Sequence, residues 1–404
     1  MEDRSFLSAE LVDDPHPYLH RLRAEDPVHW SDAHRAWLLT RYDDVVAAFR
    51  DPRLSAERIR SVLPDAVGVE EREEFDPILR LLANWMVFKD PPDHGRLRSL
   101  ARAAFTPKMI EGLRGMIEEI VDPVLDRLAR MSRADFVTDF AYPLPATVIA
   151  RMLGVPDEDQ EEFKKWSEDI EPIVFGGSDH GARRARAREG LLALETYFGE
   201  LLDRFRREPA ANLLTALARS EERGDVLSRD EVIATCILLL FAGHETTTNL
   251  LSTGLLGLLR NPDEMARLAA DPALMPVAVE EFLRYEGPTK IQPRIAVEEF
   301  ELRGRRIRPG ERVFLVQAAA NRDPEAFRDS DRLDVGRREN DHVAFGYGIH
   351  HCLGAPLARL EAKVAFARLL ERLPSLRLGD GPPVWRRTVL SRGLSSLPVS
   401  VIPV

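Results

Sequence analysis

The feature that most constrains the fold is a long apolar stretch in the second half of the chain. It opens with Ser228-Arg-Asp-Glu231, a capping box in which a serine is followed three positions later by a glutamate, and it continues to Arg260. A helix of about 32 residues rises by roughly 48 Å, which is enough to cross a domain. Its most apolar part, Val232 to Gly243, is shorter than the roughly 20 residues that a membrane-spanning helix needs. The stretch therefore predicts a helix buried inside the protein.

The rest of the chain predicts a mainly α fold with a minor β portion. Apolar residues recur at three- and four-residue spacing from about 70 to 285, and a further helix is expected over about 353–372. Alternating apolar residues bounded by turn signals predict short strands near 28–40, 295–316 and 384–401. Because no repeat or Ser/Gly-rich linker divides the chain, we expect residues 1–404 to form one large domain.

Composition and charge exclude several classes of protein. The chain has 404 residues, of which 44% are hydrophobic and 30% charged, as in ordinary soluble globular proteins. Its net charge of −11 disfavours nucleic acid as a partner. The first ten residues lack a basic region followed by an apolar run, so neither a signal peptide nor a membrane anchor is expected there. With only two cysteines, the chain fits a reducing, cytoplasmic compartment.

The segment Phe345 to Gly354, FGYGIHHCLG, carries the clearest chemical signal. Its glycines allow the backbone to turn tightly, and Cys352 comes directly before an expected helix. Backbone N–H groups and the positive end of the dipole at a helix N-terminus favour the thiolate form of a cysteine. A thiolate held in such a loop is suited to bind a soft metal or a haem iron.

Three other interpretations of Cys352 stay open on the residues alone. A buried, inert cysteine is the commonest fate of a lone cysteine. A zinc site made by His350, His351 and Cys352 lacks a C-x-x-C pair to supply the remaining ligands. A catalytic nucleophile would need a histidine partner whose position the sequence does not show. Cys236 lies in the apolar run and is expected to be core.

The cysteine loop resembles that of the cytochrome P450 family. The pattern F-x-x-G-x-x-x-C-x-G is matched by Phe345, Gly348, Cys352 and Gly354. The resemblance implies the P450 fold, a single large domain around a buried haem b (iron protoporphyrin IX), with Cys352 as the iron ligand. It also implies haem contacts from Phe345 and Gly346.

Ala242-Gly-His-Glu-Thr-Thr247, in the middle of the long helix, matches the family pattern A/G-G-x-D/E-T-T/S. The resemblance implies that Glu245 and Thr246 form an acid–alcohol pair that delivers protons for O₂ activation, with Ala242 beside the haem. Two alternatives stay open: the Thr246 hydroxyl bonds back to the Ala242 carbonyl, and Glu245 is simply paired in the core. Gly243 costs about 1 kcal/mol relative to alanine inside a helix, which indicates a kink or a close approach.

Glu281-Phe-Leu-Arg284 is an E-x-x-R pair, which in most proteins is only a solvated surface bridge. At this place in the chain it resembles the family's structural pair. The resemblance implies that Glu281, Arg284 and Arg332 form a buried network that braces the core beside the haem.

Basic residues at four family positions are expected to hold the haem carboxylates. His94 and Arg98 share one helix face, and Arg294 and His350 lie at positions where the family places further propionate contacts. Family topology also implies an apolar substrate pocket lined by Trp85, Phe88, Ile173, Phe241, Thr289, Ile291 and Leu394.

The resemblance as a whole implies a haem-thiolate monooxygenase. This oxidoreductase would insert one oxygen atom from O₂ into an apolar organic substrate of the terpenoid, steroid, fatty acid or polyketide class. Electrons would come from a separate ferredoxin or flavodoxin with its reductase, and the enzyme would act as a cytoplasmic monomer. Two alternatives are an H₂O₂-dependent peroxygenase, whose members carry Arg and Pro in place of the acid–alcohol pair, and a non-catalytic haem-thiolate sensor. A haem-independent helical protein with an inert cysteine is the third.

Overall fold

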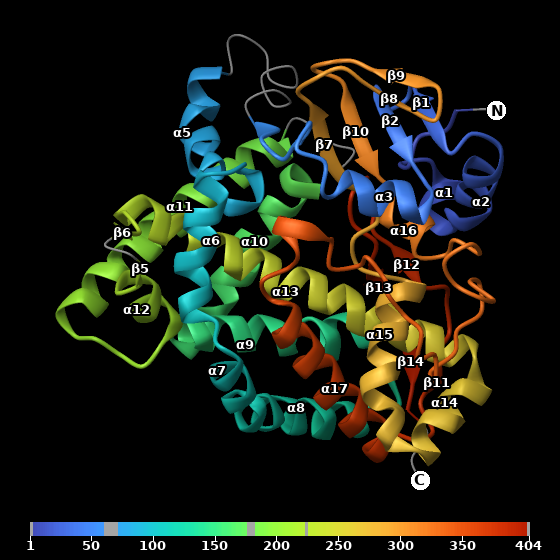
Figure 1. Ribbon diagram of the computed structural model, residues 1–404. Helices are drawn as coiled ribbons and strands as arrows, with labels where there is room; N and C mark the ends of the chain where they lie inside the picture. The colour runs from blue at the N-terminus through green and yellow to red at the C-terminus, as the bar shows by residue number, and fades with distance from the viewer. Residues whose placement is uncertain (1–2, 60–71, 176–181, 223–224, 402–404) are drawn as a thin grey trace.

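The fold is organised around one central helix. The computed structural model describes residues 3–59, 72–175, 182–222 and 225–401. Helix α13 (Arg229–Arg260) runs through the middle of the molecule, and both hydrogen bonds of its capping box, between Ser228 and Glu231, are present (Figure 1). It packs against α9, α11, α15 and α17, and most of its side chains are buried. The prediction of a long internal helix is confirmed.

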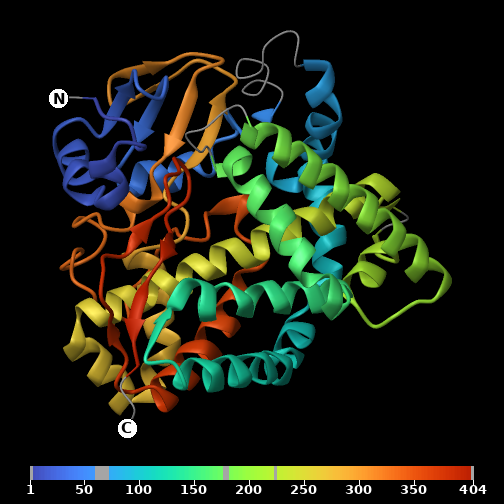
Figure 2. The ribbon, with the colours of Figure 1, turned by 180° about the vertical axis from the view of Figure 1, so that it is seen from behind.

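The other helices surround α13 and make up most of the molecule (Figures 1 and 2). The largest cluster of buried apolar side chains joins α13 to α8, α9, α11, α15 and α17. Besides α13, the described helices are α1 (Ala9–Asp13), α2 (His16–Glu25), α3 (Tyr42–Ala48), α5 (Arg72–Ala83), α6 (Asp93–Ala104), α7 (Pro107–Gly112), α8 (Arg114–Ala129), α9 (Pro143–Leu153), α10 (Gln160–Phe175), α11 (Ala182–Arg207), α12 (Leu213–Ala218), α14 (Pro262–Ala270), α15 (Met275–Tyr285), α16 (Gln317–Ala320) and α17 (Ala355–Arg372).

The strands gather mainly at one corner of the molecule, next to the N-terminal helices (Figure 1). The largest sheet has the order β1-β2-β10-β7-β3, and only β2 and β10 in it run parallel. Its strands are β1 (Val28–Ser31), β2 (Ala36–Leu39), β3 (Leu54–Ser55), β7 (Gln292–Ala296) and β10 (Arg312–Leu315). The smaller sheets consist of β11 (Arg377–Leu378), β14 (Pro398–Ser400) and β4 (Arg133–Asp135); β12 (Val384–Trp385) and β13 (Leu394–Ser396); β5 (Glu221–Glu222) and β6 (Asp225–Val226); and β8 (Phe300–Leu302) and β9 (Arg305–Ile307).

The mainly α fold with a minor β portion is confirmed, and each predicted β region contains strands. One detail differs, because the stretch expected to be wholly helical contains β4, β5 and β6. Strand β4 forms because it pairs with β14 near the C-terminal end, a partner that local spacing does not reveal. Among the helices that the structure describes, none is both long and apolar enough to cross a membrane.

A buried ionic network ties α15 to the segment before the cysteine loop. The Glu281 carboxylate accepts two hydrogen bonds from Arg284, at 2.7 and 2.8 Å, and both side chains are fully buried. Arg337 lies 3.1 Å from the same carboxylate, and the Asn340 amide donates to it at 3.1 Å. The remaining Arg284 donors bond to backbone carbonyls, including that of Arg332 at 3.1 Å. The predicted Glu281–Arg284 pair is therefore buried.

The prediction for Arg332 is wrong. Its backbone carbonyl faces Arg284, which turns the side chain outward, where it is 68% exposed and lies 3.5 Å from Glu264. Arg337 takes the place in the network that was expected for Arg332. The Arg337 guanidinium points inward and reaches the buried carboxylate.

We expect Arg284→Ala to destabilise the fold by roughly 3–5 kcal/mol, because it leaves a buried carboxylate without its main partner. Arg332→Ala is the matched control, and its exposed side chain should contribute less than about 1 kcal/mol. Denaturant unfolding of both variants measures the difference. Equal losses of stability would contradict the placement of the Arg332 side chain outside the network.

A second buried carboxyl, that of Glu361 on α17, lies against α13. Burial raises its pKa from the usual 4.5 to about 8, and among the described residues neither carboxyl oxygen has a hydrogen-bond partner within normal geometry. The folded protein therefore keeps a proton that the unfolded chain has lost between pH 4.5 and 8. Each pH unit in that window costs the fold about 1.4 kcal/mol at this site, and above the window the cost is constant.

We therefore expect Glu361→Gln to gain stability relative to the wild type as the pH rises from 5 to 8. Glutamine does not titrate, so the free energy of unfolding of the variant has no pH-dependent contribution from this position. Urea unfolding at several pH values measures the difference, with Glu371→Gln as a control because Glu371 is an exposed residue of the same helix. A difference that does not change with pH would count against the raised pKa.

Candidate functional site

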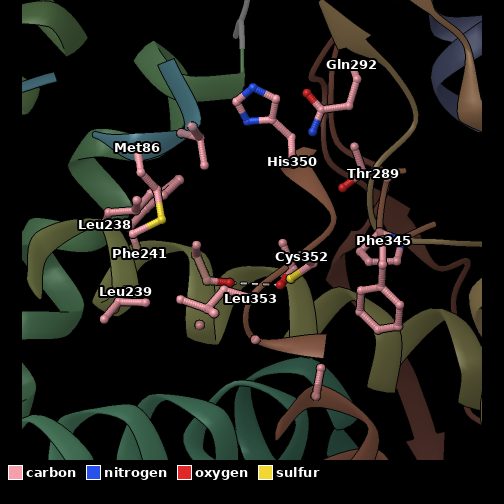
Figure 3. Close-up of a pocket in the computed structure, with 18 of the residues that line it drawn as sticks. Met86, Leu238, Leu239, Phe241, Thr289, Gln292, Phe345, His350, Cys352 and Leu353 are labelled. Atoms are coloured by element: carbon pink, nitrogen blue, oxygen red, sulfur yellow. Dashed lines mark hydrogen bonds between the residues drawn. The ribbon is translucent and has the colours of Figure 1, made fainter. Parts of the chain in front are cut away.

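A cavity of about 270 Å³ lies beside the middle of α13. Met86, Leu238 and Phe241 stand on one side of it and Thr289 and Gln292 on the other (Figure 3). His350, Cys352 and Phe345 also face it. The cavity thus brings together the central helix, the cysteine loop, α6 and the segment that leads into β7.

The cysteine loop turns tightly and presents its sulfur to this cavity. Gly346 and Gly348 have φ values of +70° and +68°, which side chains larger than glycine rarely adopt. The Cys352 N–H donates to the Phe345 carbonyl at 2.9 Å, which closes the loop just before α17 begins at Ala355. Cys352 is open to the cavity, whereas Cys236 is buried in α13, as predicted.

The surroundings of the Cys352 thiol act on its pKa in opposite directions. Burial raises the pKa of the Cys352 thiol above its usual value, and this effect is the larger one. Hydrogen bonds from the N–H groups of Gly354 and Ala355, and the positive charge of Arg98, lower it. The helix N-terminus therefore favours the thiolate, as expected, but a cationic metal at the sulfur would be needed to offset the cost of burial.

Basic side chains form a cationic cluster at one end of the cavity. We define this cluster as Arg58, His94, Arg98, Arg294 and His350, all of which line the cavity. The rings of His94 and His350 lie 4.1 Å apart, and Arg98 donates to the carbonyl of His351 at 2.6 Å. Four of these five residues were predicted from the sequence, and the structure brings all four together.

The pKa values of the residues in the cationic cluster are lowered, as expected for a basic site that suits an anionic ligand. Burial and then the neighbouring positive charges lower the pKa of His350 to about 3, and burial lowers the pKa of Arg294 to about 10. Burial and Arg294 likewise lower the pKa of Arg58 to about 9. Within the described part of the chain, Nε2 of His94 is buried without a hydrogen-bond partner. Two carboxylates placed here would relieve the repulsion, so the residues present fit the propionate end of a haem.

The predicted acid and alcohol face different surroundings. Thr246 lines the cavity, and its hydroxyl donates to the Ala242 carbonyl at 2.8 Å, so the hydrogen bond of the simpler interpretation exists here. Glu245 is buried outside the set of cavity-lining residues, where its carboxylate lies 3.4 Å from Arg386. Gly243 permits a close approach, because a Cβ on it would lie 3.1 Å from the side chain of Ile149 on α9.

Most of the predicted pocket residues line the cavity. They are Trp85, Phe88, Phe241, Thr289 and Ile291, and the predicted haem contacts Phe345, Gly346 and Ala242 line it as well. The prediction for Leu394 is wrong: it is fully buried in the main core, because β13 packs against α13 instead of reaching the cavity. Leu390, nearer the tip of the same hairpin, lines the cavity in its place. The side chain of Ile173 lies outside the described residues.

Several lining residues were missed at the sequence level. Leu238 could have been predicted, because it precedes Phe241 by three positions and shares its helix face. Gln292 lies between two predicted residues and could have been inferred from them. Arg58 and Leu390, which line the cavity, carry no local pattern that would single them out, and neither does Arg386, which lies behind the wall beside Glu245.

The zinc alternative gains no support from the geometry. The His350 ring lies against His94, whereas the His351 ring lies 6.2 Å from that of Phe345. Across the described ranges, no group of three or more His, Cys, Asp or Glu side chains could hold a metal ion.

Comparisons with known proteins identify the family of this chain. A family model described as Cytochrome P450 matches residues 195–384. Cytochrome P450 107B1 of Saccharopolyspora erythraea is 45% identical over 370 residues, which cover 90% of this chain and 89% of that protein. Polyketide biosynthesis cytochrome P450 PksS of Bacillus subtilis is 38% identical, with 97% of both chains covered.

A solved structure of P450BioI, in complex with a hexadec-9Z-enoic acid ligated acyl carrier protein, has the same fold. It superimposes with a TM-score of 0.90 at 35% identity and covers 98% of this chain and 99% of that one. The chain therefore belongs to the cytochrome P450 family of haem-binding monooxygenases.

Proposed function

We propose that Cys352 is the iron ligand and that the propionates of haem b lie against His94, Arg98, Arg294 and His350. The observation that carries this proposal is that the sulfur of a glycine-rich loop opens into the cavity whose end is lined by these four basic residues. In this arrangement Phe345, Gly346 and Ala242 contact the haem, since all three line the same cavity.

The protein is a monooxygenase that inserts one oxygen atom of O₂ into an apolar organic substrate and takes its electrons from a redox partner. The haem supplies the iron at which O₂ is activated. We propose that this chain contributes the protons through Thr246 and Glu245. Oγ1 of Thr246 holds a proton at the cavity wall. The Glu245 carboxylate, one residue away on the same helix, takes up a proton from water, passes it on to replace the one that Thr246 gives up, and regains its negative charge beside Arg386.

The substrate we propose is a largely apolar molecule of the terpenoid, steroid, fatty acid or polyketide class. Trp85, Phe88 and Phe241 form a run of stacked rings at 5.8 and 6.2 Å along one wall of the cavity. Thr289 and Gln292 offer a hydroxyl and an amide on the opposite wall, which suits a few polar substituents. PksS is named as a polyketide biosynthesis enzyme, and P450BioI was solved with a fatty acyl chain. Polyketides and fatty acids are two of the proposed substrate classes.

We further propose that residues 1–404 act as one P450 domain and as a monomer in the cytoplasm. Coverage of nearly the whole length of the solved relative supports a single domain. A separate ferredoxin or flavodoxin with its reductase is the proposed electron donor.

The reduced protein under CO is expected to show the red-shifted Soret band of a thiolate-ligated haem. Cys352→Ser should abolish this band, because a serine oxygen does not supply the electron density of a thiolate sulfur. Cys236→Ala is the matched control and should retain the band, since Cys236 lies inside α13 away from the cavity. An unshifted band in the wild-type protein would refute the ligand assignment.

We expect Thr246→Ala to uncouple O₂ consumption from product formation. Loss of the Oγ1 proton should lower the product formed per O₂ by roughly tenfold and raise H₂O₂ release correspondingly. Thr246→Ser keeps the hydroxyl and should restore most of the coupling, and Thr248→Ala serves as a control because Thr248 is buried outside the cavity lining. Coupling that does not change in Thr246→Ala would leave the hydroxyl as a purely structural feature of the helix.

A further inference from the structure

The hairpin formed by β12 and β13 touches both the cavity and the buried acid. We call residues 384–396 the C-terminal hairpin. Near its base, the Arg386 N–H donates to the Gly393 carbonyl at 3.0 Å, and Nε of Arg386 donates to the Leu394 carbonyl at 3.3 Å. These bonds fix the Arg386 side chain to the opposite strand, so that it moves with the hairpin.

The base of the hairpin lies directly on the turn of α13 that carries Glu245. Nη1 of Arg386 lies 3.4 Å from Oε1 of Glu245, and both side chains are largely buried. Nδ2 of Asn249, one helical turn further on, is 3.5 Å from the same oxygen. Gly393 contacts Asn249 so closely that a Cβ at this position would overlap the Asn249 amide. The hairpin and this part of α13 are therefore packed without space between them.

The tip of the same hairpin forms part of the cavity wall. Leu390 lines the cavity, and its carbonyl accepts hydrogen bonds from the N–H groups of Lys290 and Ile291 at 2.8 and 3.1 Å. Thr289, which also lines the cavity, pairs with Ser391 in an isolated β-bridge. Contact with a substrate at Leu390 therefore acts on the element that carries Arg386.

We propose that Arg386 is a positioning residue that holds the Glu245 carboxylate in its place behind the cavity wall. Because the pair is largely buried, removal of the arginine takes a charged partner away from a carboxylate that water reaches poorly, which costs more than the loss of a surface bridge. The hairpin joins this pair to the substrate wall through Leu390. The inference rests on the proposed role of Glu245 in supplying protons.

The test compares Arg386→Met and Arg386→Lys in the wild-type and Glu245→Gln backgrounds, with myristic acid as the probe and a surrogate ferredoxin system as donor. Arg387→Met is the matched control, since Arg387 is the exposed neighbour and donates to the Leu7 carbonyl. The readouts are the fraction of consumed O₂ released as H₂O₂, the solvent isotope effect on O₂ consumption, the CO-bound spectrum and the thermal unfolding midpoint.

Arg386→Met is expected to change the H₂O₂ fraction and the solvent isotope effect by roughly threefold. Arg386→Lys should bring both readouts most of the way back to their wild-type values. Arg387→Met should match the wild type. In the Glu245→Gln background, Arg386→Met should add nothing, because the group that it positions is no longer a carboxylate. The CO-bound spectrum should be the same in all variants.

Equal effects of Arg386→Met in both backgrounds, or an effect no greater than that of Arg387→Met, would overturn the positioning role. If Glu245→Gln alone changes neither readout, the proposed proton supply fails and the inference fails with it. If Glu245→Gln changes the two readouts but Arg386→Met does not, the positioning role of Arg386 fails while the proposed proton supply stands.

Discussion

The packing of α13 against α17 is the constraint on which the rest of the structure depends. The first helix carries Thr246 at its middle, and the second begins directly after Cys352. Because both helices belong to one apolar cluster, the sulfur and the hydroxyl are held at walls of the same cavity. The Glu281–Arg284–Arg337 network adds a polar brace between α15 and the segment that precedes the cysteine loop.

Charge is distributed unevenly around the cavity, and the distribution suits the proposed chemistry. Basic groups gather at one end, where burial lowers the pKa of both His350 and Arg294, and the neighbouring positive charges lower the pKa of His350 further. The acid of the central helix lies outside the cavity lining and is paired with Arg386. An anionic ligand thus gains at the cationic cluster, while the negative charge of Glu245 is kept behind the wall, away from an apolar substrate.

Much of the fold and of the site could be predicted from local patterns. The long helix with its capping box and the cysteine loop lie where they were expected, and most of the residues predicted to contact haem or substrate line one cavity. The failures have a common physical origin. Arg332 and Leu394 are correctly placed in the chain, but their side chains point the wrong way, because backbone direction within a turn or a short strand depends on the tertiary partner.

The sequence by itself determined the helical core, the tight cysteine loop and the family, because these depend on residues that are close together in the chain. Tertiary structure alone decided which arginine completes the Glu281 network, that Leu390 and not Leu394 reaches the cavity, and that Glu245 is paired with Arg386. Each of these contacts joins segments that are distant in the chain, and a guanidinium or a leucine at the end of a flexible side chain leaves no periodic signal. The pairing of Glu245 with Arg386, for example, is decided by the packing of the C-terminal hairpin on α13.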